Sequence, residues 1–254
     1  MASSERFGFA WSRFPKIVPE HEFFFRSWVA GLVPEDFRGK RILDAGCGIG
    51  RNSFWPLQYG AAETVAFDLD PRTVRVAREN LSFTDRAKVS QSSIYEIAYQ
   101  DEFDIVLSIG VIHHLHDPKR AMANLVRAAK PGGTVRIWVY AREGHTGLKL
   151  IINSVRRFTS KLPAQLVEVL TVPFSSLFYA YVHLKKHDHP YLRLLRDARF
   201  WHVHSILFDQ LLPEVSNYWT REEAFALFND LPVTDVNVQF CNEGSWAVWA
   251  RKKT

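Results

Sequence analysis

The feature that most constrains the fold is a glycine-rich turn after an apolar segment, ILDAGCGIGRN, at residues 42–52. A strand that turns sharply into a helix and lets a ligand touch its main chain needs residues without a Cβ atom. The glycines have the spacing GxGxG, whereas the dinucleotide fingerprint is GxGxxG, and Arg51 stands where that fingerprint has Gly or Ala. The segment therefore predicts a ligand-binding loop of another kind.

Asp44 places a carboxylate just before the glycines. Nicotinamide, flavin and S-adenosylmethionine sites all begin with glycine-rich turns, so the glycines alone do not choose among them. A carboxylate here would repel a pyrophosphate but can hold an ammonium group. The loop therefore favours a ligand with an amino-acid end over a diphosphate.

Four segments resemble motifs of the class I S-adenosylmethionine-dependent methyltransferases, in particular the small-molecule, ubiquinone-biosynthesis-like subgroup. DAGCGIGR resembles the first motif and VAFDLDP the second, which ends a strand about 20 residues after the glycines. FDIVLSIGVIHHLHDP resembles the fourth strand and its loop, and AAKPGGTVRIWVY the fifth strand with its preceding turn. The resemblance spans about residues 41–141. It implies S-adenosylmethionine as cofactor and S-adenosylhomocysteine as product.

The resemblance also implies cofactor-binding residues. Asp44 and the glycine loop would hold the methionine end, Asp68 the ribose hydroxyls and Leu69 the adenine. Ser93 departs from the family pattern, which often has an acidic residue there that contacts the adenine amino group. The implied set is Asp44, Gly46, Cys47, Gly48, Gly50, Asp68, Leu69, Ser93, Ile94, Ile109 and Gly110.

Two histidines after the fourth strand are the candidate catalytic residues. Methyl transfer is an in-line displacement at a sulfonium carbon, so the protein aligns the nucleophile, excludes water and removes a proton where needed. His113 and His114 could act as the general base, because the imidazole pKa suits proton transfer near neutral pH. A structural role is equally open. We expect His114 to be structural or next to the cofactor and His113 to lie nearer the substrate.

Apolar strands alternate with amphipathic helices, which predicts an α/β fold. We expect a Rossmann-like doubly wound sheet, mostly parallel, with a C-terminal antiparallel hairpin and a helical lid insertion. The expected strands are 41–45, 64–68, 88–92, 103–109, 134–140, 233–241 and 245–251. The expected helices outside the insertion are 19–31, 51–59, 71–81, 118–130 and 220–231.

The chain divides into a cap, a sheet domain and an insertion. Residues 1–40 form an N-terminal helical cap, in which the helix at 19–31 packs on the sheet or covers the cofactor. Residues 41–144 and 213–254 form the Rossmann-like domain, and residues 145–212 the lid. We expect two or three lid helices, with breaks at Pro163, Pro173 and Pro190. The lid lies above the carboxyl ends of the strands, where open α/β sheets bind ligands.

The lid carries the whole excess of positive charge. It has nine Lys or Arg and four Asp or Glu, whereas the rest of the chain is balanced. This favours an anionic partner, although solvated helix faces have the same composition. The apolar stretch 162–184 contains Gln165, Glu168 and two prolines, so it is a poor membrane-spanning candidate. An amphipathic pair of helices that contacts an oily substrate or a membrane interface remains an alternative to packing within the domain or at a homodimer contact.

Aromatic and histidine side chains of the lid are expected to line the acceptor pocket. The pairs His183 with His187 and His202 with His204 could suggest a metal, but no cysteine or paired carboxylate accompanies them, and we expect none. The expected substrate residues are Tyr140, Tyr191, Trp201, His202 and His204.

These features together predict a methyltransferase of a small-molecule acceptor, such as a secondary metabolite or a lipid-like or sugar-like compound. The pI of 9.2 raises the alternative of RNA or another macromolecule. The fourth strand ends SIGV, however, without the Asn/Asp-Pro-Pro-aromatic signature that cradles a flipped base, so nucleic acid is not favoured. A non-catalytic S-adenosylmethionine-binding protein is the third possibility. The two cysteines form no disulfide framework and the N-terminus resembles no signal peptide, so we expect a cytoplasmic protein.

Overall fold

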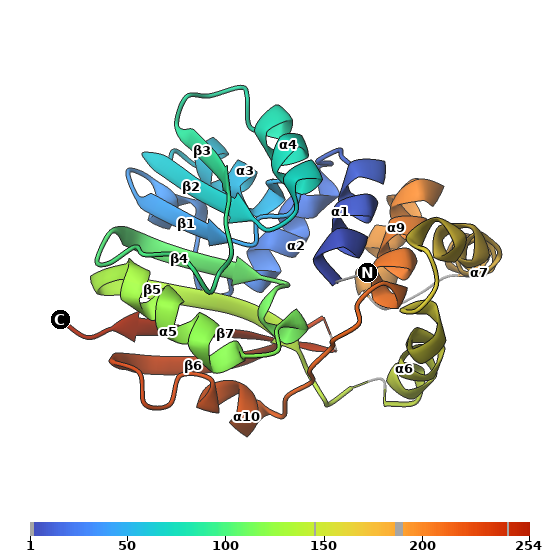
Figure 1. The fold of residues 1–254 in the computed structure, drawn as a ribbon. Helices are drawn as coiled ribbons and strands as arrows, with labels where there is room; N and C mark the ends of the chain where they lie inside the picture. The colour runs from blue at the N-terminus through green and yellow to red at the C-terminus, as the bar shows by residue number, and fades with distance from the viewer. Residues whose placement is uncertain (1–2, 145, 186–189, 243) are drawn as a thin grey trace.

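The computed structural model describes residues 3–144, 146–185, 190–242 and 244–254. Its centre is a seven-stranded sheet in the order β3-β2-β1-β4-β5-β7-β6 (Figure 1). Strands β1 to β5 are parallel, and β7 pairs antiparallel with both β5 and β6. This confirms the Rossmann-like doubly wound sheet with a C-terminal hairpin. The strands are β1 (Arg41–Ala45), β2 (Glu63–Asp68), β3 (Ala87–Gln91), β4 (Phe103–Ile109), β5 (Ala129–Tyr140), β6 (Val233–Cys241) and β7 (Ser245–Lys252).

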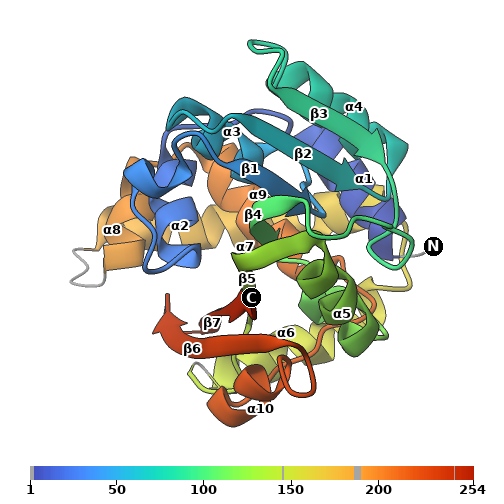
Figure 2. The same ribbon diagram turned by 90° about the vertical axis from the view of Figure 1, so that its left-hand side faces the viewer.

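Helices cover both faces of the sheet (Figure 2). On one face, α2 (Glu20–Trp28) and η1 (Pro34–Phe37) bring Phe25 and Phe37 against Ile42 and Leu107, and α3 (Arg51–Gln58) lies beside them. On the other face, α5 (Pro118–Ala128) and α10 (Arg221–Ala226) complete the largest apolar cluster. The short helix η2 (Ile112–His114) follows β4, and α4 (Pro71–Asn80) connects β2 to β3. Burial on both faces explains why the central strands read as continuous apolar runs.

Several expected boundaries differ from the structure, and the helix expected at 19–31 ends at Trp28, three residues early. Helix α5 ends at Ala128, and β5 already begins at Ala129, so the Pro-Gly-Gly segment lies inside β5, where the register with β4 shifts. A Cβ at Gly133 would lie 3.0 Å from the Phe103 carbonyl oxygen, so the strand needs glycine there. Helix α10 ends at Ala226, five residues early, although Thr220 and Glu223 form the expected capping box.

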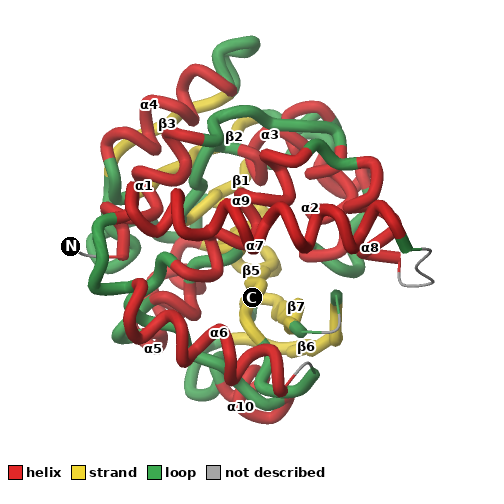
Figure 3. The backbone as a smooth tube through the Cα atoms, turned by 90° about the vertical axis from the view of Figure 1, so that its right-hand side faces the viewer, coloured by secondary structure: helices red, strands yellow, loops and turns green. Residues whose placement is uncertain are grey.

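The insertion contains α6 (Thr146–Thr159), α7 (Ala164–Leu184), α8 (Pro190–Asp197) and α9 (Phe200–Leu211). The break expected at Pro173 is wrong, because α7 continues through it. Pro173 is exposed and removes one backbone donor, and the turns on either side hold the helix. Helices α7 and α9 lie side by side at the end of the molecule that faces the viewer in Figure 3.

Helix α1 (Ser3–Arg13) lies between the sheet domain and the insertion (Figure 1). Ala10 packs with Val167 of α7 and Phe208 of α9. On its other side, Gly8 meets the start of α4, where an added Cβ would lie 2.1 Å from the Asp70 carboxyl carbon. This helix was not predicted from the sequence. Of the two roles expected for the helix at 19–31, α2 has the first, because it packs on the sheet, and α1 is the helix that reaches the carboxyl ends of β1 and β2.

Candidate functional site

The glycine loop forms a tight turn at the carboxyl end of β1. Gly46, Gly48 and Gly50 have φ angles of 78°, 55° and 84°, in the left-handed region that favours glycine. A Cβ at Gly46 would lie 2.4 Å from a methyl carbon of Val111 in the loop after β4. The backbone nitrogens of Gly46 and Cys47 both donate to the Phe67 carbonyl oxygen at 2.9 Å. The loop is thus held against β2, and its spacing follows from these close approaches.

Asp44 is the fully buried carboxylate beneath this loop. Its Oδ2 accepts a hydrogen bond from the Ser53 hydroxyl at 2.7 Å, whereas its buried Oδ1 has no partner among the described residues. Burial raises the pKa of Asp44 to about 7. A carboxylate oxygen that is buried and unpartnered suits an ammonium donor, so the residues present fit the amino-acid end of S-adenosylmethionine.

Asp68 ends β2 beside the loop. Its Oδ2 accepts from the Gly48 backbone nitrogen at 2.9 Å, and its Oδ1 from the Asp70 nitrogen at 3.3 Å. Burial raises its pKa, while the backbone donors oppose this shift. The neighbouring Leu69 is half exposed. The carboxylate is therefore held by main-chain groups at the junction of loop and strand.

The other expected cofactor residues surround the same edge of the sheet. Ser93 uses its hydroxyl to accept from the Tyr95 backbone nitrogen, at 3.2 Å. Ile94 is buried, and its carbonyl oxygen accepts from the Asn124 amide at 2.9 Å. Ile109 is buried at the end of β4, and Gly110 has a φ of 81°. The structure thus brings all of these positions to the carboxyl ends of the strands.

His113 and His114 lie in η2, directly after β4. The His113 ring is buried and stacks on Tyr140, with centroids 3.8 Å apart, and burial lowers its pKa well below the usual value. His114 uses Nδ1 to donate to the Val215 carbonyl oxygen at 2.8 Å, and burial lowers its pKa to about 4. Both imidazoles are therefore neutral at pH 7. His114 ties η2 to the segment after α9.

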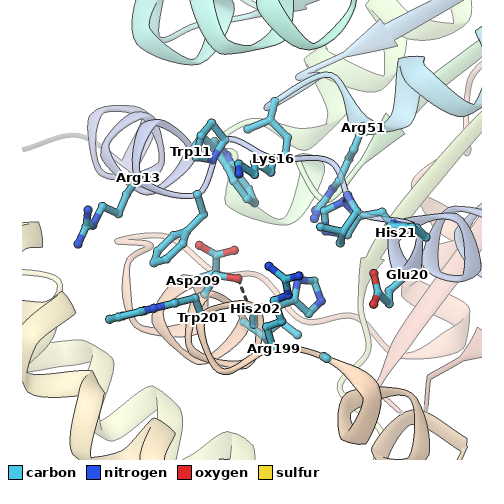
Figure 4. A pocket seen from close by; sticks show the side chains of 18 residues that line it. Trp11, Arg13, Lys16, Glu20, His21, Arg51, Arg199, Trp201, His202 and Asp209 are labelled. Atoms are coloured by element: carbon cyan, nitrogen blue, oxygen red, sulfur yellow. Dashed lines mark hydrogen bonds between the residues drawn. The ribbon is translucent and has the colours of Figure 1, made fainter.

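A cavity of about 740 Å³ lies between α1, α2 and α9, next to the glycine loop (Figure 4). Arg51, the first residue of α3, reaches into it and lies over the rings of Trp11 and Trp28, with its Cζ 5.2 and 5.1 Å from their centroids. Asp209 of α9 faces the same space, and its buried Oδ1 has no partner in the described part of the chain. Burial raises the pKa of Asp209 to about 7, and the Arg51 charge opposes this shift.

Two histidines face each other across the cavity. His21 of α2 and His202 of α9 have ring centroids 5.3 Å apart. Burial lowers the pKa of His21 to about 2 and also lowers that of His202. The cavity thus combines neutral imidazoles and tryptophans with the basic side chains of Arg13, Lys16, Arg51 and Arg199 and the carboxyl groups of Glu20 and Asp209. It can therefore bind a compound that is partly aromatic and partly polar.

The expected substrate residues divide into two groups. Trp201 and His202 line the cavity. Tyr140 and His204 lie outside its lining, since Tyr140 stacks on His113 and His204 accepts or donates a hydrogen bond with Ser175 of α7 at 2.8 Å. The side chain of Tyr191 lies outside the described residues, as does His187. His202 and His204 are on a helix, so they do not project alike as strand residues would. No group of three metal-binding side chains gathers among the residues that the structure describes.

Sequence reasoning missed Asp209 and His21 and did not assign Arg51 a binding role. No motif marks them, because they come from three separate helices. A signal existed only for Arg51, which replaces the Gly or Ala of the dinucleotide fingerprint. Their convergence depends on how the insertion folds back onto the loop.

Residues 43–137 match the family described as a methyltransferase domain. This segment contains the glycine loop, Asp68, both histidines, strands β2 to β4 and parts of β1 and β5. The segment is similar to this family of methyltransferase domains. The match covers less than half of the chain and leaves out α1 and the insertion.

The curated relatives match about half of the chain. An uncharacterised protein of Synechococcus is 39% identical over 48% of this chain and 30% of its own length. A ribosomal protein L11 methyltransferase of Erwinia tasmaniensis is 28% identical over 56% of this chain and 43% of its length. A ubiquinone biosynthesis O-methyltransferase of Thiobacillus denitrificans is 32% identical over 44% and 47%. The chain spans less than half the length of these relatives.

Solved structures share the fold over almost the whole chain. A methyltransferase of Thermotoga maritima, described as a possible histamine N-methyltransferase, has a TM-score of 0.59 and 16% identity over 99% of this chain and 100% of its own. Human N-acetylserotonin methyltransferase, solved with S-adenosylmethionine, has a TM-score of 0.56 and 15% identity over 100% and 57%. At these identities the likeness concerns the fold.

Proposed function

We propose that the chain binds S-adenosylmethionine on the glycine loop and transfers its methyl group to a small molecule held in the cavity beside α9. The observation that carries the cofactor assignment is the unpartnered Oδ1 of buried Asp44 beneath a glycine turn. The residues that would hold the cofactor are Asp44, Asp68 and the main chain of the loop. When bound, the cofactor supplies an electrophilic methyl group on a sulfonium centre.

The cavity supports a small acceptor. Its volume of about 740 Å³ is in the range of small-molecule pockets, and it adjoins the glycine loop through Ile49 and Arg51. Trp11 and Trp201 of the lining can stack on a planar group, and Arg51 can pair with a carboxylate or phenolate. Asp209 can accept a proton near pH 7 because its pKa is close to that value. These residues would orient the acceptor and exclude water.

Protein methylation is the competing acceptor class, because ribosomal protein L11 methyltransferases are among the relatives. Radiolabelled cofactor separates the two classes when the purified protein is incubated with a small-molecule extract and, separately, with ribosomal proteins. We expect label in the low-molecular-weight fraction. Label that appears only in a protein band would overturn the small-molecule proposal and leave the cofactor assignment standing.

Calorimetry tests the cofactor assignment directly. We expect Asp68→Asn to weaken S-adenosylmethionine binding about tenfold or more, since one charged hydrogen bond contributes roughly 1.5–3 kcal/mol. Asp85→Asn is the matched control, because Asp85 is exposed in the loop before β3 and should leave binding unchanged. Equal binding by both variants would sink the assignment.

A further inference from the structure

The large apolar side chains of helix α7 are exposed to solvent, whereas a helix of a water-soluble domain usually buries them. Its buried positions include the small or hydroxyl-bearing residues Ala164, Thr171 and Ser175. The large apolar side chains are exposed instead, and Phe174 and Leu177 are 69% and 71% exposed. The exposed large hydrophobic residues of α7 are Leu166, Val169, Leu170, Phe174, Leu177, Tyr181 and Leu184.

These residues form a stripe along α7, and α6 carries a second stripe of the same kind. Positions 166, 170, 174, 177, 181 and 184 recur every three or four residues, so they share one face of α7. Ile151, Val155 and Phe158 have the same spacing on α6 and are also exposed, Phe158 to 74%. Figure 3 looks onto the side of the molecule on which both helices lie. We call these nine side chains the apolar face.

The opposite side of α7 packs against the rest of the protein. Val167 packs with Ala10 of α1 and Phe208 of α9, and the Ser175 hydroxyl contacts the His204 ring at 2.8 Å. The helix is long and apolar enough to cross a membrane, but a spanning position would strip away these contacts. A helix that is apolar outward and packed inward suits a position in the plane of an interface.

The charges next to the apolar face are basic. Residues 146–185 contain five Lys or Arg and a single Glu, and that Glu168 is paired with Arg13 at 2.8 Å. Arg157 and Lys161 near the end of α6, and Lys185 after α7, are exposed. Lys185 holds its ammonium 5.3 Å from the Tyr181 ring centroid, at the end of the stripe. Such residues complement anionic headgroups while their stems stay among apolar groups.

We propose that the apolar face of α6 and α7 docks the protein on the surface of a membrane that contains anionic lipid. The side chains of the stripe enter the boundary between headgroups and acyl chains, and Arg157, Lys161 and Lys185 contact the phosphates. This docking is independent of methyl transfer, because no residue of the apolar face belongs to the glycine loop or is assigned a role in the cavity.

Co-sedimentation with vesicles tests the proposal. Phosphatidylcholine vesicles with phosphatidylglycerol should bind the protein, and pure phosphatidylcholine vesicles should bind it more weakly. Phe174→Glu combined with Leu177→Glu should lower partitioning at least about a hundredfold, because two apolar side chains no longer enter the bilayer and two negative charges face the anionic lipid. The matched control is Phe83→Glu combined with Phe225→Glu, two exposed phenylalanines outside the insertion, which should leave partitioning unchanged.

A second pair of variants tests the charges. Lys161→Gln and Lys185→Gln should each weaken binding to the anionic vesicles about fivefold and leave binding to phosphatidylcholine unchanged. Calorimetric binding of S-adenosylmethionine by every variant shows that the fold is intact. If the unmodified protein binds vesicles but does not bind S-adenosylmethionine, the proposed function is refuted and this inference stands.

Four results would overturn the docking proposal. The first two are a failure to bind anionic vesicles and an equal effect of the control substitutions. The third is resistance of the bound protein to extraction with alkaline carbonate, which indicates a spanning helix. The fourth is a dimer in solution that Phe174→Glu combined with Leu177→Glu dissociates. The last result would assign the apolar face to a second copy of this chain.

Discussion

At the scale of single residues, Asp44 links cofactor binding to pH. Its pKa in the free protein is about 7, and the ammonium group of the cofactor favours the ionised form. Affinity for S-adenosylmethionine should therefore rise from pH 6 to pH 8 and level off above that. Calorimetry across this range measures the slope. Asp44→Asn should bind about a hundredfold more weakly and without this dependence; a variant that keeps the slope would assign it to another group.

Asp209 gives a second prediction at this scale. As the proton acceptor in the cavity, it should support methyl transfer with a rate that rises through pH 7, where its carboxyl ionises. Asp209→Asn should lower turnover about a hundredfold and keep cofactor affinity. Asp230→Asn, in the loop after α10, is the matched control. If Asp209→Asn instead weakens acceptor binding with turnover unchanged, the carboxyl group positions the acceptor and moves no proton.

Single residues also mark the limit of sequence reasoning about the site. Asp44 and Asp68 could be predicted because each follows a strand inside a local motif, and local sequence determines where such a residue lies. Arg51, Asp209 and His21 come from α3, α9 and α2, and their proximity depends on packing between distant segments. The position of His113 and His114 after the fourth strand could be predicted from the sequence. Their protonation state could not, because it results from burial in the folded protein.

At the scale of elements, α1 joins the two halves of the molecule through Arg6. This side chain is buried, and its guanidinium donates to the carbonyl oxygens of Leu212, Leu162 and Thr159 at 2.7, 2.6 and 2.8 Å. All three acceptors belong to the ends of insertion helices or to the segments next to them. The helix C-termini leave such carbonyls unpaired, and Arg6 satisfies them from outside the insertion.

We predict that Arg6→Met lowers the free energy of unfolding by about 2–4 kcal/mol, because buried carbonyl groups lose a charged donor. Denaturant unfolding measures this loss. Arg13→Met, on the same helix, is the control and should have a much smaller effect, because Arg13 is exposed and makes a surface ion pair. A Cβ atom added at Gly48 would lie 3.6 Å from the Trp11 ring nitrogen, so α1 lies against the glycine loop. Because Arg6 holds α1 in place, Arg6→Met should also weaken cofactor binding. Equal loss in both variants would show that α1 contributes through its apolar contacts.

Elements also show what the sequence could and could not predict. The strands and the capping box at Thr220 follow local patterns, and the structure contains them. Helix α1 was missed because its aromatic residues obscure the helical period, and they are needed to fill the space between α4, α7 and α9. The break expected at Pro173 was wrong because a proline on an exposed face costs one hydrogen bond, which tertiary contacts on the other face offset.

At the scale of the whole molecule, buried titratable groups give the stability of the protein a maximum near neutral pH. Burial lowers the pKa of His21, His113, His114, His202 and His204 from the usual 6.5, so the unfolded chain binds protons there that the folded chain does not. Stability is therefore lost as the pH falls below 6.5.

Asp44 and Asp209 act in the opposite direction. Their folded pKa values of about 7 exceed the usual 3.8, so the folded chain holds two protons that the unfolded chain has released, and stability falls as the pH rises toward 7. Just below pH 6.5 the five histidines outnumber the two carboxyl groups, and between pH 6.5 and about 7 the carboxyl groups act alone. The free energy of unfolding of the cofactor-free protein should therefore peak near pH 6.5.

Thermal unfolding across pH 5–9 tests this balance. Asp44→Asn combined with Asp209→Asn should remove the decrease above pH 6.5 and make the loss of stability on the acidic side steeper, because the histidines then act unopposed by these two carboxyl groups. Saturating S-adenosylmethionine should shift the maximum to higher pH, since binding stabilises the ionised form of Asp44. A maximum at the same pH with and without the cofactor would show that Asp44 does not change its proton occupancy on binding, and the ammonium group would then have to be held elsewhere.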